Sequence, residues 1–339
     1  MTEDPLIKAY QLADRLKELA PWEFMKEQEV FGVRIPDTGE QYFLSVMGTA
    51  GEHYSIAAYK GLWGLNGFWE LHVPNTWVRP MELMLIPHFM ISFENRELID
   101  PAVRKKMKAL GFTYRGKNAW PKLQQIIPGF VPAEPDEENL QYLIVIMEQA
   151  INVIERIKTK PDLVYPEAGR NDDYLVRVKV GETNDAEGWK DIWWERKQPS
   201  RRYHLTFKDR ELNLIEKLPL SKDTLQADIA LMSTPVSDPG TKPYFSSVYM
   251  VTNTNLGIIT DFEMLTPLKG IDAMHARFPD LLIKSILKSQ EQPASIEIRH
   301  PALCAMAEKV FSGTKIKIVL KNQLHHVNEV LANFEFGKF

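Results

Sequence analysis

Apolar and polar residues alternate with a period of two along several short runs of the N-terminal part, which is the pattern of half-buried strands. These runs predict strands over 31–35, 42–47, 54–59 and 88–93. The first two are separated by 36–39, which contains a proline, an aspartate and a glycine and favours a reversing turn. We therefore expect an antiparallel sheet in this part of the chain.

Two N-terminal segments instead carry apolar residues at helical spacing. The first begins with an acidic N-cap, Asp4, followed by Pro5 at the first helical position, and it ends before Pro21. The second begins at Asp136 and ends by Pro161. Its apolar stripe consists of Leu140, Leu143, Ile144, Met147, Ile151 and Ile154. Strands and helices together predict an α+β N-terminal domain.

The least ordinary stretch runs from Tyr42 to Trp69, where glycines alternate with aromatic residues. A short helix interrupted by glycine is predicted over 62–70. Because glycine lets other groups approach the backbone closely, we interpret this stretch as the structural centre of the N-terminal domain.

The C-terminal part has the clearest succession of elements. Three strands are predicted over 227–232, 245–252 and 258–265, and a helical region begins at 266. Further on, strands over 296–298 and 316–320 alternate with helices over 301–313 and 324–334. The order β-β-β-α-β-α-β-α predicts an α/β domain with a mixed sheet.

Between these parts, 158–173 is rich in proline, charge and turn-forming residues, and we place a domain boundary there. The runs 174–180 and 189–197 predict a hairpin, in which Trp193 and Trp194 point to opposite faces and offer a contact surface. The expected organisation is an α+β domain over 1–160, a connecting segment with this hairpin over 161–222, and an α/β domain over 223–339.

Composition narrows the class of protein. The chain has 339 residues, of which 44% are hydrophobic and 25% charged, as in ordinary soluble proteins. A net charge of -4 argues against a general nucleic-acid-binding surface. A single cysteine, Cys304, excludes an internal disulfide, and no apolar run approaches the length of a membrane span. We expect a cytoplasmic protein without a membrane segment.

Several N-terminal motifs together resemble a family of uncharacterised bacterial proteins that pair two domains of unknown function. The motifs are Pro21-Trp22-Glu23, Ser45-Val46-Met47-Gly48, Gly51-Glu52-His53 and Gly67-Phe68-Trp69, with the segments 92–98 and 115–121. The resemblance covers most of the chain, and it implies no particular activity.

The C-terminal part resembles, more distantly, the ribonuclease-H-like fold of integrases and nucleases. That resemblance implies acidic metal ligands on the first strand, at the end of the fourth strand and on a late helix. Asp228 falls on the first strand and Glu329 on the last helix, but the fourth strand ends at Arg299. A guanidinium repels Mg²⁺, so we expect a remnant acidic site of Asp228 and Glu329 without a metal or cofactor.

A second group of candidate residues lies in the N-terminal domain. Glu52 and His53 pair a carboxylate with an imidazole, a combination suited to acid-base chemistry at a cleft edge. Arg96, with Arg115, Asn118 and Trp120 of a predicted loop, provides groups that suit an anionic or planar ligand. The competing interpretation is structural: Glu52 and His53 face water in a turn, an Arg-Glu pair braces the loop, and Trp120 is buried in the core.

The chain lacks a P-loop and the GxSxG, HExxH and CxxC motifs, and no nucleophile with a base and an orienting group is visible. The leading hypothesis is therefore a non-enzymatic binding module with a macromolecular partner, a protein rather than a nucleic acid. The alternatives are an enzyme or small-ligand binder with its site in the N-terminal domain, a metal-dependent nuclease, and a protein that binds nucleic acid without cleaving it.

Overall fold

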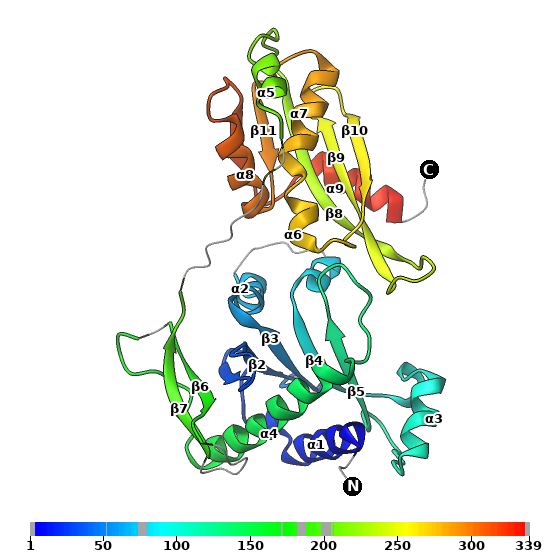
Figure 1. The fold of residues 1–339 in the computed structure, drawn as a ribbon, viewed down its shortest axis with the longest axis vertical. Coiled ribbons are helices and arrows are strands. Elements are labelled where there is room, and N and C mark those ends of the chain that lie inside the picture. The colour runs from blue at the N-terminus through cyan, green and yellow to red at the C-terminus, as the bar shows by residue number, and fades with distance from the viewer. Residues whose placement is uncertain are drawn as a thin grey trace. The chain divides into compact units, whose positions relative to one another are not determined.

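The computed structural model describes residues 4–51, 53–73, 80–170, 172–181, 188–197, 205 and 207–335. Within these residues, the strands form one sheet of seven strands and one of five (Figure 1). The chain divides into two compact units, which alternate along the sequence. The N-terminal unit comprises Met1–His72, Ile86–Ile127 and Pro132–Pro199, and the C-terminal unit comprises Val73–Leu85, Pro128–Val131 and Ser200–Phe339.

The N-terminal unit contains the larger sheet, in the order β5-β4-β3-β2-β1-β6-β7. Neighbouring strands are antiparallel except β1 and β6, which are parallel. The strands are β1 (Phe31–Arg34), β2 (Gln41–Met47), β3 (Ser55–Lys60), β4 (His88–Glu94), β5 (Trp120–Ile126), β6 (Asp173–Lys179) and β7 (Trp189–Glu195). Its helices are α1 (Pro5–Leu19), α2 (Gly61–Leu71), α3 (Pro101–Ala109) and α4 (Glu137–Thr159), with short 3-10 turns η1 (Pro21–Glu23) and η3 (Arg96–Leu98). This architecture confirms the predicted α+β class.

Helices α1 and α4 lie along one face of the larger sheet, and their apolar stripes form the main core with it (Figure 1). The Asp4 carboxylate accepts a hydrogen bond from the backbone N of Leu6 at 2.9 Å. The Asp136 carboxylate accepts one from the backbone N of Asn139 at 3.1 Å. Both predicted N-caps therefore satisfy otherwise unpaired N–H groups at the start of a helix.

Helix α2 packs on the opposite face, over Phe43 and Tyr59. Its own residue Phe68 is fully buried between the helix and the sheet. Gly64 faces the sheet so closely that a Cβ atom there would lie 2.8 Å from the Tyr59 carbonyl carbon and 2.9 Å from the Pro87 carbonyl oxygen. Glycine is thus required at this position by close backbone approach rather than by a turn. The predicted helix over 62–70 is confirmed.

The hairpin of β6 and β7 continues the larger sheet because β6 pairs with β1, with Gly32 opposite Val176. It therefore belongs with the N-terminal unit rather than with a connecting segment over 161–222. Gly32 lets the two strands pack closely, since a Cβ atom there would lie 2.8 Å from a Val176 methyl carbon. Trp193 is 39% exposed, whereas the Trp194 ring packs 5.2 Å from that of Phe43.

An ionic network attaches the hairpin to α4. Arg177, 4% exposed on β6, donates hydrogen bonds to Gln149 at 3.2 Å and to the Asp191 carboxylate at 3.0 Å. Arg156 of α4 donates to the same carboxylate at 3.2 Å. Burial favours the neutral form of Asp191, but the hydrogen bonds from the two arginines outweigh it and lower the pKa of this carboxyl.

We predict that Asp191→Asn lowers the free energy of unfolding by about 2 kcal/mol at pH 7, since it leaves buried Arg177 without a counter-ion. Because the folded pKa of Asp191 is lowered, its contribution is present at neutral pH and is lost as pH falls through that pKa. Urea unfolding of both proteins from pH 7 down to acid should show the difference shrinking. Exposed Asp162 offers a control, and an Asp191→Asn loss no larger than that of Asp162→Asn would contradict the prediction.

The C-terminal unit contains the smaller sheet, in the order β10-β9-β8-β11-β12. The first three strands along the chain are antiparallel neighbours, whereas β11 runs parallel to both β8 and β12. The elements are η2 (Pro80–Leu85), α5 (Asp209–Ile215), β8 (Thr224–Val236), β9 (Tyr244–Asn253), β10 (Ile258–Leu265), α6 (Ile271–His275), α7 (Phe278–Ser289), β11 (Ser295–Ile298), α8 (Pro301–Phe311), β12 (Lys317–Leu320) and α9 (His325–Glu335). The predicted succession of strands and helices is confirmed from β8 to α9.

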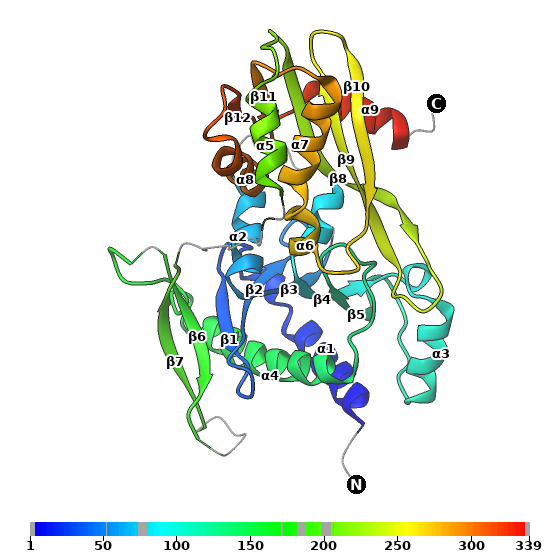
Figure 2. The same ribbon diagram turned by 45° about the horizontal axis from the view of Figure 1, so that its top comes forward.

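Helices cover both faces of the smaller sheet. Residues of α5, α6, α7 and α8 form one core with Ala227 and Ile229 of β8. Helix α9 packs on the other face, against Ala230 of β8 and Val248 and Met250 of β9. Figure 2 shows α7 and α9 on opposite sides of the strands. Since side chains alternate along a strand, Asp228 points to the face that α9 covers.

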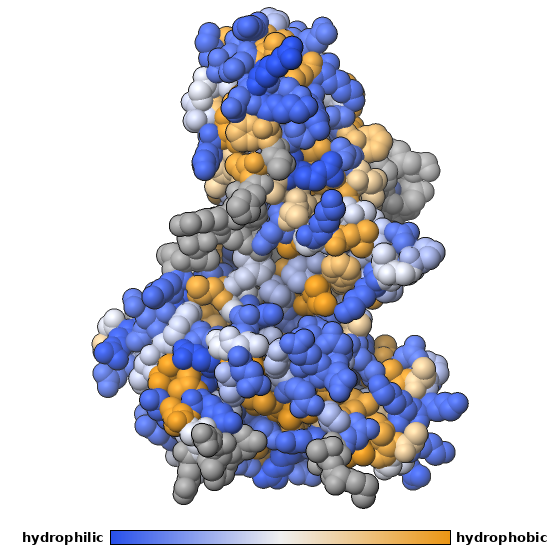
Figure 3. All heavy atoms as spheres, in the orientation of Figure 1, coloured by the Kyte–Doolittle hydropathy of each residue, from blue (hydrophilic) through white to orange (hydrophobic). Residues whose placement is uncertain are grey.

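Hydrophilic residues dominate the face of the molecule drawn in Figure 3, and apolar residues lie among them in small groups. Within the described part of the chain, none of the helices combines the length and the apolar character that crossing a lipid bilayer requires.

Candidate functional site

The most unusual polar arrangement is an ionic centre formed by Asp228, Arg299 and Glu82. Asp228 lies on β8 and is 1% exposed, and Arg299 directly follows the last residue of β11. Because Ile298 is opposite Ala227 in the parallel pair, the next residues of the two strands, Arg299 and Asp228, also meet. Glu82 lies in η2, which belongs to this unit although it comes far before β8 in the sequence.

The guanidinium of Arg299 lies between the two carboxylates. Its Nη2 is 3.5 Å from Asp228 Oδ2, and its Nη1 donates to Glu82 Oε2 at 3.1 Å, while Nη2 also donates to Glu82 Oε1. The other oxygen of Asp228 accepts the backbone N–H of Ile229 at 2.9 Å. The arginine fork thus contacts Glu82 with two parallel bonds, the strongest geometry for such a pair.

The electrostatics of the centre favour a permanently charged arginine. Burial alone would lower the pKa of Arg299, but Asp228 and Glu82 outweigh it and hold that pKa above its ordinary value. The side chain of Arg299 is only 11% exposed and that of Glu82 only 19%. A buried cation therefore neutralises carboxylates that would otherwise be available to bind a metal ion.

The two residues expected to form an acidic site, Asp228 and Glu329, lie in different environments. Asp228 is buried on β8 beside Arg299, whereas Glu329 lies exposed on α9. Among the residues that the structure describes, no group of three or more Asp, Glu, His or Cys side chains is arranged to hold a metal ion. The chemistry of this donor set does not fit a two-metal centre.

Part of the candidate ligand set in the N-terminal unit gathers around Glu94 at the end of β4. The Nδ1 of His53, which is half exposed, lies 3.9 Å from Glu94 Oε1. The hydroxyl of Ser92 donates to the same oxygen at 2.8 Å. On the neighbouring strand, Trp120 is directly opposite Glu94, and its ring packs 5.7 Å from that of Tyr114.

The other members have separate contacts. The backbone N of Asn118, which has a φ of 50°, donates to Asn95 Oδ1 at 2.9 Å. Arg96 is exposed, and its carbonyl oxygen accepts a hydrogen bond from Arg104 at 3.4 Å. Arg115 is exposed and makes no hydrogen bond or ion pair with another described residue. Glu52 lies outside the described residues.

Comparison with known families bears on both halves of the chain. Residues 7–177 match a family described as a domain of unknown function, DUF7309. The chain belongs to the DUF7309 family. Residues 211–335 match a second domain of unknown function, DUF6930, so the predicted pairing of two such domains is confirmed. No curated protein matches the sequence. The DUF7309 match ends within β6, although the sheet continues into β7.

Cys304 lies near the start of α8, 3% exposed. Burial, together with nearby Glu308, raises the pKa of its thiol to about 11. The reactive thiolate is therefore scarce at neutral pH.

We predict that a disulfide reagent such as DTNB modifies the native protein at pH 7.5 at least about a hundredfold more slowly than the urea-unfolded protein, measured by absorbance. Equally fast modification of native protein would contradict a buried, inert thiol.

Proposed function

We propose that this protein acts by binding rather than by catalysis, and that its C-terminal unit is a catalytically inactive relative of the ribonuclease-H-like fold. The strand order β10-β9-β8-β11-β12, with three antiparallel strands followed by two parallel ones, supports the fold relationship. The final helix α9, packed against β8 and β9, supports it further. Fold alone does not decide activity, so the proposal depends on the site.

The position of Arg299 is the single observation that carries the proposal. In the active enzymes of that fold, carboxylates near the ends of these strands bind divalent cations that align the attacking water. Here a buried guanidinium lies against Asp228 and Glu82, at 3.5 Å and 3.1 Å respectively. A cation held in place by the protein occupies the position that a hard metal ion would need.

A nuclease assay tests this proposal directly. Purified full-length protein is incubated with single- and double-stranded DNA and RNA in the presence of Mg²⁺ or Mn²⁺. We expect no cleavage above that of Asp228→Asn, and no calorimetric heat of Mn²⁺ binding that this substitution removes. Metal-dependent cleavage by the natural protein that Asp228→Asn abolishes would overturn the proposal.

An apolar strip on β10 favours a protein as the partner. Phe262 and Met264 are 64% and 54% exposed and lie opposite Met250 and Val248, on the face that α9 covers only in part. Exposed apolar side chains on a sheet edge are typical of protein contact surfaces. The net charge of -4 does not favour nucleic acid. We also infer a cytoplasmic location, since the chain contains a single cysteine.

Quantitative affinity purification from the native host tests the partner. The tagged protein is compared with a variant carrying Phe262→Ser and Met264→Ser. Leu256→Ser is the matched control, because Leu256 is equally exposed at 64% but lies in the loop before β10. We expect the double variant, and not the control, to lose a specific protein. An unchanged set of proteins would exclude this surface as the binding site, and binding that only nuclease treatment removes would indicate nucleic acid.

A further inference from the structure

A basic hollow lies on the larger sheet beside its outermost strands. Its volume is about 890 Å³, and its lining includes Arg34, Val178, Lys179, Lys190 and Ile192. The lining residues come from β1, the turn after it and the hairpin of β6 and β7, so the whole hollow belongs to the N-terminal unit. Its size falls within the range of small-molecule sites in proteins.

Strand register places several residues that line the hollow on one face of the sheet. Val178 is opposite Lys190 and Val176 is opposite Ile192, so these side chains share one face of the hairpin. Arg34 is opposite Gln41. Two residues earlier Gly32 is opposite Phe43, so Arg34 and Phe43 lie on the same face. Helix α2 covers this face over β2 and β3 and contacts the hairpin at Arg196, directly after β7, whereas the hollow lies at the opposite end of the hairpin (Figure 1).

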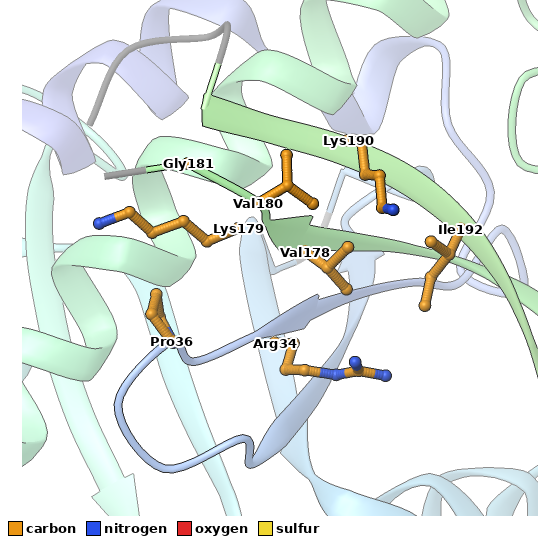
Figure 4. A pocket seen from close by; sticks show the side chains of 8 residues that line it. All are labelled: Arg34, Pro36, Val178, Lys179, Val180, Gly181, Lys190 and Ile192. Carbon is orange, nitrogen blue, oxygen red and sulfur yellow. The ribbon is translucent and has the colours of Figure 1, made fainter. Parts of the chain in front are cut away.

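The charged side chains that line the hollow among the described residues have one sign. They are three cationic residues, with no carboxylate in that part of the lining. Figure 4 shows the side chains of Arg34 and Lys190 directed to the same side of the hollow, with Val178 and Ile192 beside them, whereas Lys179 extends away. Neither Arg34 nor Lys190 forms an ion pair with a described residue.

Other arginines of this hairpin are already engaged. Arg177, on the covered face, contacts Gln149 and Asp191. Arg196, which follows β7, donates from its Nε to Asn66 of α2 at 2.8 Å. Within the described residues, positive charge without a carboxylate partner thus remains at Arg34 and Lys190, next to partly buried Ile192.

We propose that the basic hollow binds a small organic phosphate, independently of the function proposed for the C-terminal unit. The planar fork of Arg34 matches phosphate oxygens with two parallel hydrogen bonds, and Lys190 adds a compact charge. Ile192, which is partly buried, and the small exposed part of Val178, which is 6% exposed, offer an apolar surface to the body of the ligand. The ligand that suits the hollow therefore carries both a phosphate and an apolar or planar group. A molecule with only one of these two parts binds more weakly.

Calorimetric titration of the full chain tests this proposal with three probes: phenyl phosphate, inorganic phosphate and phenol. We expect phenyl phosphate to bind most tightly, inorganic phosphate at least about tenfold more weakly, and phenol without measurable heat. Arg34→Gln and Lys190→Gln should each weaken phenyl phosphate binding about tenfold. Lys105→Gln, at an exposed position on α3, should leave it unchanged.

Circular dichroism and thermal unfolding of each variant confirm that it remains folded before titration. Phenyl phosphate that binds no better than phenol overturns the proposal, as does an affinity that both substitutions leave unchanged. Tighter binding of inorganic phosphate than of phenyl phosphate would exclude the role assigned to Val178 and Ile192. None of these results depends on whether the C-terminal unit cleaves nucleic acid.

Discussion

Replacing Arg299 with alanine is expected to lower the free energy of unfolding of the C-terminal unit by about 3–5 kcal/mol. The substitution leaves the carboxylate of Asp228, which is 1% exposed, next to that of Glu82 with no cation between them. Two partly or fully buried negative charges then repel each other in a medium of low dielectric. Amide hydrogen exchange along β8 and β11 in the full-length protein measures this loss without requiring both units to unfold together.

A double variant that also neutralises Asp228 separates the effect of the unbalanced charge from the effect of the lost packing of Arg299. The double variant Asp228→Asn with Arg299→Met should recover about half of the loss, because the fully buried charge of Asp228 is gone and only Glu82, whose side chain is 19% exposed, is left without its cation. Arg210→Ala, at an exposed position on α5, serves as the control and should change stability by no more than about 0.5 kcal/mol. An Arg299→Ala loss as small as that of the control would mean that the ionic centre contributes nothing to folding.

Gly64→Ala is expected to destabilise the N-terminal unit by about 2–3 kcal/mol, although alanine is the better helix former by about 1 kcal/mol. The added methyl group would lie 2.8 Å from a backbone carbon of Tyr59 and 2.9 Å from the carbonyl oxygen of Pro87. Backbone atoms on two neighbouring strands cannot move aside as a side chain can. Helix α2 must therefore shift away from the sheet, which also loosens the packing of Phe68.

Gly67→Ala provides a graded comparison on the same helix. Its Cβ would lie 2.8 Å from a γ carbon of buried Ile86, a side chain that can shift more readily than backbone, so we expect a smaller loss of about 1–2 kcal/mol. Thermal unfolding monitored by tryptophan fluorescence measures both variants. If Gly64→Ala instead raises the melting temperature, helix propensity dominates and the close contact with the sheet is not a constraint.

Much of the fold follows from local signals in the sequence. The caps at Asp4 and Asp136 and the stripe of the long helix predict α1 and α4, because these features act within a few residues. The succession from β8 to α9 is equally local. The position of the β6 and β7 hairpin could not be predicted, since its parallel pairing with β1 joins segments that are far apart in the sequence and no local signal marks it.

The residues of the candidate sites also differ in whether the sequence alone could point to them. Arg299 could be singled out because it follows a short predicted strand, and Asp228 because it lies within one. Glu82 could not, since its segment has no hydrophobic period and it meets Arg299 across 217 residues. The basic hollow was missed for a different reason. Arg34 and Lys190 look like ordinary surface cations until the sheet brings them together at one hollow, because β1 and β7 are far apart in the sequence.

The interleaving of the two units along the chain has a consequence for protein synthesis. Glu82 lies within the DUF7309 match but belongs to the C-terminal unit, whose remaining partners, Asp228 and Arg299, lie in the DUF6930 match. During translation, its carboxylate leaves the ribosome first and remains hydrated until Arg299 follows. A gene fusion or a recombination event that transfers the DUF6930 region alone would therefore leave this arginine half neutralised. The two regions are expected to be inherited together.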